Sequence, residues 1–244
     1  MGDFYTYFFA HLPEVWSGLG VTVAATVLGS ALALVLAFGF GFMARGRAAL
    51  VRGVSRVLVE FFRGTSLYVQ LFWLYYALPL LIGYELSPLF CGVVALGINY
   101  GAYGSEVVRG ALNAVPKAQW EAAVALNMSP AQRMRRVILP QAWPQMIPSF
   151  TNLLIQLLKC TPLLWLISAA DLTTVVQQMR DRTGESAAAY LTLLVLYFVL
   201  AYALTLLMNA LERHARGRLD GRSGTRAALR ARVAKTGATT GGAR

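Results

Sequence analysis

Charged residues are scarce in this sequence. Only 14% of its 244 residues are Asp, Glu, Lys or Arg, whereas soluble domains average about 25%. Hydrophobic residues make up 57% of the chain. This shortage of charge excludes an ordinary soluble domain, and we expect most of the chain to be surrounded by lipid.

Cysteine and histidine are also scarce, with two of each. Cys91 and Cys160 are isolated within apolar runs, and His11 and His214 lie near opposite ends of the chain. This gives no support for a disulfide framework, a metal cage or a bis-histidine haem site. No GxxxxGK(S/T) sequence is present, so we expect no nucleotide or other cofactor to be bound by this chain.

Apolar runs fill most of the sequence. Crossing about 30 Å of hydrocarbon takes about 20 residues, and such windows lie near 18–43, 64–82, 88–108, 145–170 and 187–210. They predict an all-α membrane protein with five transmembrane helices in a domain spanning 17–210.

The two ends of the chain have different compositions. Residues 1–16 are rich in aromatic side chains and predict a short helix at the membrane interface. Residues 211–244 mix Arg, Gly, Ala and Thr, which predicts a basic, disordered tail.

The net charge of +11 is distributed unevenly. Basic residues cluster in 44–63, 109–144 and the C-terminal tail, whereas the segment before the first span holds Asp3 and Glu14 without Lys or Arg. The positive-inside rule therefore predicts an outside N-terminus and a cytoplasmic C-terminus. Topology explains the charge, so nucleic-acid binding is disfavoured.

One long polar interlude, 117–140, interrupts the apolar runs. Apolar residues recur at helical spacing on both sides of a break at Asn127–Ser129–Pro130. We expect two short helices, with Ser129 capping the second and Pro140 ending it. Such an exposed element suits contact with a soluble partner, although amphipathicity alone equally fits an ordinary linker.

Polar residues recur at i, i+4 and i+7 in two predicted spans. Because polar groups are costly in lipid, both stripes should face the protein interior or a water-filled cavity. One interpretation is a substrate path; the alternative is interhelical hydrogen bonding that holds the bundle together. The candidate path residues are Asn99, Tyr103 and Glu106 in the third span, Asn152, Gln156 and Lys159 in the fourth, and Thr161 beyond it.

The 117–140 segment resembles the EAA signature of ABC importer permeases. Glu121-Ala122-Ala123 is followed after three residues by Asn127, and after nine more by Val137, then Leu139-Pro140. Asn127 stands where the family usually has Gly, and Asn tolerates the left-handed conformation. The resemblance implies that this segment contacts an ATPase through Trp120, Glu121, Ala122, Ala123, Val124, Asn127, Met128, Leu139 and Pro140.

Other motifs resemble the polar amino-acid uptake branch of these permeases, over residues 15–210. They are Phe62-Arg63-Gly64-Thr65, Val69-Gln70-Leu71-Phe72, Ala102-Tyr103-Gly104-Ser105-Glu106, Leu139-Pro140-Gln141-Ala142, and Lys159 followed by Thr161. Within the branch, the runs 64–73 and 125–129 look most like ectoine and hydroxyectoine permeases.

The resemblance implies a non-enzymatic transport subunit in the bacterial inner membrane, importing a small polar or zwitterionic solute such as ectoine or a polar amino acid. It also implies ATPase subunits that bind ATP and Mg, a second identical or related permease, an external solute-binding protein and surrounding lipid. A passive channel is the alternative, but it leaves 117–140 unexplained. An intramembrane enzyme would need a catalytic constellation that Glu106 alone does not supply.

Overall fold

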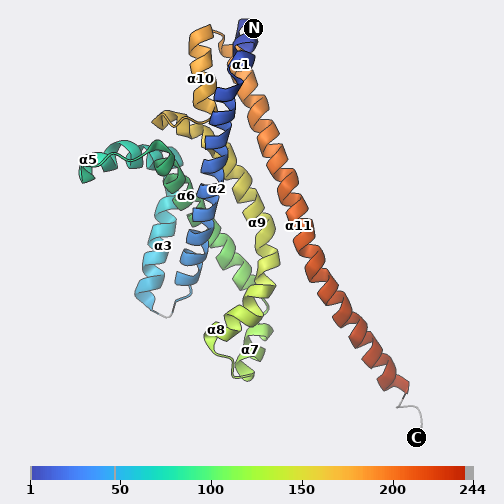
Figure 1. Ribbon diagram of the computed structural model, residues 1–244. Helices are drawn as coiled ribbons and strands as arrows, with labels where there is room; N and C mark the ends of the chain where they lie inside the picture. The colour runs from blue at the N-terminus through green and yellow to red at the C-terminus, as the bar shows by residue number, and fades with distance from the viewer. Residues whose placement is uncertain (1, 47, 240–244) are drawn as a thin grey trace. The chain divides into compact units, whose positions relative to one another are not determined.

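The computed structural model describes residues 2–46 and 48–239, with side chains up to Arg213. The chain forms two compact units, Met1–Ala203 and Leu204–Arg244. Every regular element in the described residues is helical. In order they are α1 (Gly2–Ala10), α2 (Leu12–Met43), α3 (Ala49–Gly64), α4 (Leu67–Phe72), the π-helical η1 (Trp73–Ala77), α5 (Leu78–Ile82), α6 (Pro88–Ala114), α7 (Lys117–Ala125), α8 (Pro130–Arg133), the π-helical η2 (Met134–Ile138), α9 (Leu139–Cys160), the 3₁₀-helical η3 (Thr161–Ile167), α10 (Leu172–Thr183) and α11 (Ser186–Thr239) (Figure 1).

Helix α6 lies at the centre of the first unit and packs against α2, α3, α4 and α9. Glycines allow α2 and α6 to approach closely. A Cβ on Gly101 would lie 2.7 Å from the Cβ of Leu36, and one on Gly97 would lie 2.5 Å from Leu32 Cδ2. Close backbone approach through small residues is a standard way to pack helices in lipid.

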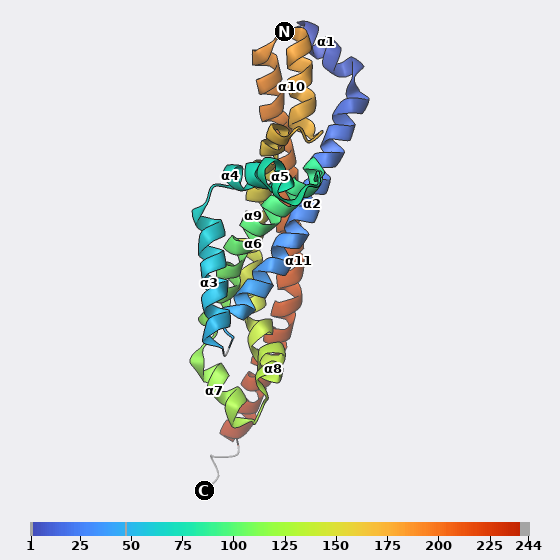
Figure 2. The ribbon, with the colours of Figure 1, turned by 90° about the vertical axis from the view of Figure 1, so that its left-hand side faces the viewer.

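The structure differs from the sequence-based boundaries of the second span and of the loop before it. Residues 44–63 were expected to be a cytoplasmic loop, but most of them form α3, which runs back alongside α2 (Figure 2). The segment Leu67–Ile82 then turns by 101° from α3. A search for long apolar runs missed α3, because Arg52, Arg56 and Arg63 lower the average hydropathy of this stretch. Its apolar residues nevertheless form an exposed face.

Among the described residues, three helical segments are long and apolar enough to cross a membrane: Leu12–Met43, Pro130–Ile167 and Ser186–Arg213. The bent pair Ala49–Gly64 and Leu67–Ile82 raises this to four. Helix α6 covers the expected span 88–108 and is long enough, at about 1.5 Å per residue, but it falls outside that set. The five-span count and the orientation of the termini stay predictions.

At one end of the first unit, α1 and α10 lie together, and α7 and α8 lie at the other end (Figure 1). Phe4 of α1 is fully buried with Leu172, Val176 and Met179 of α10. The N-terminal helix ends at Ala10, short of the expected 1–16, and after a turn at His11 the residues from Leu12 onward belong to α2. Its place at a membrane interface stays a prediction.

The backbone of the C-terminal tail is helical to Thr239, as part of α11. Ala and Arg, which are frequent in the tail, are both good helix formers. Residues 240–244 and the side chains after Arg213 lie outside the described residues, so the expected tail properties stay predictions.

Candidate functional site

The sequence break in 117–140 forms a specific helix ending. Helix α7 stops at Ala125, and Asn127 adopts a left-handed φ of 53°. The N–H of Asn127 donates to Val124 O at 2.8 Å, and that of Met128 donates to Ala123 O at 3.1 Å. This pair of bonds defines a Schellman motif, in which Gly is usual and Asn is the common substitute. The expected left-handed turn at Asn127 is confirmed.

The second short helix also begins as expected. The Ser129 hydroxyl accepts from the Gln132 N–H at 3.3 Å, and Gln132 Oε1 accepts from the Ser129 N–H at 3.1 Å, which completes a capping box. The expected stop at Pro140 is wrong, because α9 continues through it. The π-helical turn η2 directly precedes Leu139-Pro140, and its wider spacing accommodates the proline ring.

Helix α7 is fixed to the rest of the first unit through Trp120. The Arg45 guanidinium lies 4.8 Å from the centre of the Trp120 ring, and its Nη1 donates to Asn113 Oδ1 at 2.6 Å. Burial lowers the pKa of Arg45 from its usual value, but an arginine remains charged at neutral pH. Trp120 also packs against a core containing Leu112 and Ile138. The indole therefore faces the body of the first unit.

The exposed residues on α7 and directly after it form what we call its outer face. Glu121 and Ala122 are exposed, and Val124 and Leu126 are 53% and 71% exposed. Ala123 is buried and Met128 is half-buried. Trp120, Val124 and Met128 were therefore not all exposed as expected. Trp120 packs against the first unit, Val124 is open to solvent and Met128 is half-buried. The sequence analysis did not identify Leu126 or Arg45 as part of this site. A signal for Arg45 was present, because it follows the first span directly and belongs to the basic residues assigned to the same side of the membrane as 117–140.

The polar stripe of α6 is paired with the junction of α3 and α4. Asn99 Nδ2 donates to Phe62 O at 3.1 Å and to Gln70 Oε1 at 3.3 Å. Tyr103 donates its hydroxyl to Arg63 O at 3.3 Å. These bonds satisfy backbone carbonyls where the chain turns by 101°. Asn99 and Tyr103 thus make the interhelical hydrogen bonds that are expected if the stripe holds the helices together rather than lining a substrate path.

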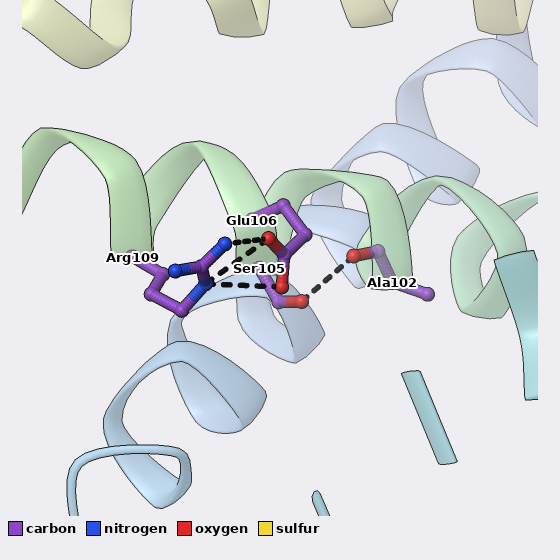
Figure 3. Close-up of polar contacts among 4 residues, drawn as sticks. All are labelled: Ala102, Ser105, Glu106 and Arg109. Carbon is purple, nitrogen blue, oxygen red and sulfur yellow. Dashed lines mark hydrogen bonds and ion pairs between the residues drawn. The ribbon is translucent and has the colours of Figure 1, made fainter. Parts of the chain in front are cut away.

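Glu106 completes this stripe through a pairing within α6. Its carboxylate accepts from Arg109 Nε at 3.0 and 3.2 Å, and a further contact joins it to Arg109 Nη2 (Figure 3). Ser105, beside it, donates its hydroxyl to Ala102 O at 2.7 Å. The acidic side chain therefore already has a cationic partner on its own helix.

The polar stripe of α9 has different surroundings. Asn152, Gln156 and Lys159 are all exposed, and no hydrogen bond joins them to the α6 stripe in the part of the chain that the structure describes. Thr161 is fully buried and donates to Leu158 O at 2.8 Å. The structure thus places the two stripes on adjacent helices but does not bring their polar groups together.

Comparisons with known proteins agree with this architecture. The family described as "Binding-protein-dependent transport system inner membrane component" matches residues 33–217, well over half of the chain. This chain belongs to that family. It is an amino-acid-type permease subunit of a binding-protein-dependent ABC importer, with the all-helical type I permease fold, and a multi-pass protein of the inner membrane.

The individual relatives are amino-acid permeases. The probable amino-acid ABC transporter permease y4tF of Sinorhizobium fredii is 44% identical over 207 residues, covering 83% of this chain and 87% of its own length. The L-cystine permease TcyB of Bacillus subtilis is 33% identical, with coverage of 82% and 86%. A crystal structure of an amino acid ABC transporter with histidines aligns with a TM-score of 0.79 and 30% identity, covering 86% of this chain and 97% of that one.

Proposed function

We propose that the outer face of α7 contacts an ATP-hydrolysing partner and couples its cycle to the inward passage of a small zwitterionic solute. The observation that supports this best is the two-sided character of α7. Trp120 anchors the helix to the body beneath Arg45, while Glu121, Ala122, Val124 and Leu126 stay exposed. Arg45, just after α2, contacts both Trp120 of α7 and Asn113 of α6. A movement of α7 would therefore be passed to α6 and to the end of α2 through these contacts.

The proposed assembly follows from the membership of this chain in a family of ABC importer permeases. ATP and Mg are assigned to the partner ATPases, whose closure would tilt the permease helices and alternate access to the path. A second permease chain, identical or related, would cover the exposed stripe of α9. A lysine facing lipid costs about 2.5–3.5 kcal/mol on insertion scales, so Lys159 is expected to face that second chain or a water-filled path between the two.

Substitution on the outer face tests the coupling. Glu121→Arg combined with Ala122→Arg should lower solute-stimulated ATP hydrolysis about tenfold, as expected when contacts at the centre of an interface are lost. The measurement uses proteoliposomes that contain the permease, its ATPase and its binding protein. Ala131→Arg, which adds the same side chain at an exposed position of α8, is the control. Unchanged stimulation in the double variant would reject α7 as the contact, and uptake without any ATPase would favour a passive channel.

The solute belongs to the amino-acid class in this proposal. The relatives named above transport, or are described as transporting, amino acids, and the sequence also resembles ectoine and hydroxyectoine permeases in 64–73 and 125–129. Ectoine and amino acids share a zwitterionic character. Competition by unlabelled ectoine, cystine and polar amino acids against labelled solute in the same vesicles separates them. Uptake inhibited only by ectoine would support the narrower assignment, whereas inhibition only by amino acids would remove it.

A further inference from the structure

Helix α3 is held at its α4 end and makes few contacts within the chain over the rest of its length. At the α4 end, side chains of α6 donate hydrogen bonds to the carbonyls of Phe62 and Arg63, at 3.1 and 3.3 Å. Of the 16 residues of α3, only Ser55 and Val59 are buried, and the Ser55 hydroxyl donates to Phe40 O of α2 at 3.0 Å. Segments with few buried contacts are among the first to move in a folded protein. The α4 end can therefore act as a hinge for the rest of α3.

A pocket of about 600 Å³ lies between α3 and the helices beside it, α2 and α6 (Figure 2). The charged side chains that line it are Arg52, Arg56, Glu60 and Arg63 on α3, and Glu106 and Arg109 on α6. Both walls thus carry both signs of charge. Because charged groups are costly in a membrane protein unless they are paired or hydrated, such side chains are expected to pair across the pocket or to be surrounded by water.

The acidic residue on the α6 wall is paired within its own helix. Glu106 accepts from Arg109, three positions further along α6 (Figure 3). Arg56 and Arg63 of α3 lie close enough to act electrostatically on the Glu106 carboxylate, but neither is bonded to it. Among the described residues, the side chains of Arg56, Glu60 and Arg63 make no hydrogen bond or ion pair. Opposite charges on the two walls therefore lie near one another without contact.

Arg63 is already oriented beside this carboxylate. Its guanidinium lies 5.2 Å from the centre of the Tyr103 ring, and Tyr103 is one helical turn from Glu106 on α6. A cation–π contact orients a guanidinium over the ring without using its N–H groups. Arg63 thus keeps its donors for a carboxylate, which is the acceptor that best matches their planar geometry.

We propose that α3 swings about its α4 end and closes on α6, and that Glu106 is the switch between the open and closed states. In the open state, Glu106 binds Arg109. In the closed state, Glu106 binds Arg56 and Arg63 instead, and the released Arg109 binds Glu60. Because a bond within α6 is exchanged for bonds between α6 and α3, the pairing of Glu106 sets the position of α3. The switch is a property of this chain, and its use in controlling access to the polar stripe of α6 rests on the proposed transport function.

The distance between the start of α3 and the end of α6 measures this movement. Spin labels are attached at Leu50→Cys and Ala114→Cys, both exposed, in the purified full-length chain from which Cys91→Ala and Cys160→Ala remove the native thiols. Pulsed electron paramagnetic resonance gives the populations of long and short distances. Arg109→Gln should raise the short-distance population about fivefold, as expected when a competing ion pair is removed.

Further variants distinguish a switch from an ion pair that only stabilises α6. Adding Arg56→Gln and Arg63→Gln to Arg109→Gln should return the short-distance population to its original value. Exchanging the pair, by Glu106→Arg with Arg109→Glu, keeps an ion pair within α6 but places a cation beside the arginines of α3, so the short-distance population should fall. Arg180→Gln, which removes an exposed ion pair on α10, is the matched control and should leave the distances unchanged.

Glu60→Gln tests the closed state without disturbing the pair within α6. It removes the second partner of Arg109 and should lower the short-distance population, whether or not Arg109→Gln folds normally. Unchanged distances in Arg109→Gln or in Glu60→Gln would overturn the proposal. A short-distance population that survives when Arg56 and Arg63 are also replaced would overturn it as well. Because transport is not measured, a failure of the proposed solute or ATPase contact would produce none of these results.

Discussion

The polar stripes of α6 and α9 have the same spacing in the sequence and opposite surroundings in the structure. Asn99 and Tyr103 on α6 bond to carbonyls at the junction of α3 and α4, whereas Asn152, Gln156 and Lys159 on α9 are exposed. The i, i+4, i+7 pattern thus identifies a face of a helix without identifying what covers it. On α6 the stripe stabilises the fold of this chain, and on α9 it is open to a partner, a solute or water.

The same division runs through α7. Trp120 faces the body, and Glu121 and Ala122 face outward. We therefore expect inward-facing substitutions to change the amount or rigidity of folded permease. Outward-facing substitutions should instead change transport at a constant amount of folded permease. Four predictions test this difference.

The largest effect is expected at Lys159. Lys159→Met should lower solute uptake tenfold or more, because losing one member of a charged hydrogen bond to solute costs about 1.5–3 kcal/mol. The quantity of permease in the membrane and its unfolding midpoint should not change. Uptake into proteoliposomes and quantitative blotting measure the two. Lys159→Arg, which keeps the charge, should retain most of the uptake; normal transport in Lys159→Met would remove this residue from the path.

The next effect is expected on stability. Asn99→Leu removes the donor to Phe62 O and Gln70 Oε1, and interhelical hydrogen bonds in membranes average about 0.6 kcal/mol each, with values up to about 1.7. The free energy of unfolding should fall by about 1–2 kcal/mol, measured by titration with denaturing detergent. Uptake per folded molecule should stay near normal.

Asn152→Leu on α9 is the matched control for that measurement. Asn152 is exposed and has no side-chain hydrogen bond among the described residues, so its unfolding free energy should not fall. If Asn152→Leu destabilises the chain as much as Asn99→Leu, the contrast between the two stripes is incorrect.

An effect of similar free energy but confined to one short helix is expected at the contact between Arg45 and α7. Arg45→Ala removes the hydrogen bond to Asn113 and the cation–π contact with Trp120, together worth about 1–2 kcal/mol. This loss is local, so α7 should become mobile while the bundle stays folded. ATP hydrolysis should continue with fewer solute molecules transported per ATP. Asn113→Ala removes only the hydrogen bond and should cause a smaller fall in solute transported per ATP. Unchanged transport per ATP in Arg45→Ala would show that other contacts hold α7 in place.

Local signals in the sequence predicted the local structure well. The break after α7, the left-handed Asn127 and the Ser129 cap each depend on residues within six positions of one another, and all three are confirmed. The family resemblance was likewise sufficient to place the chain among amino-acid importer permeases.

Features that depend on distant contacts were not predictable in the same way. Trp120 has the spacing of an outward anchor, but Arg45, which comes from 75 positions earlier in the chain, covers its ring. Helical periodicity cannot distinguish an apolar face that meets the protein from one that meets a partner. Pro140 looked like a stop because proline lacks an N–H, yet the π-helical turn η2 carries the helix past it.

The smallest effect is expected at Asn127, and its sign depends on the substitution. Asn127→Gly should leave the Schellman ending intact and gain a few tenths of a kcal/mol, because glycine adopts a left-handed φ without strain. Asn127→Val should cost about 1 kcal/mol or more, because a β-branched residue is strained at a φ of 53°. The strain should weaken the hydrogen bonds that the N–H groups of Asn127 and Met128 donate to the last turn of α7. Transport per ATP should therefore fall in Asn127→Val and stay normal in Asn127→Gly, and equal coupling in the two variants would show that this helix ending does not set the position of α7.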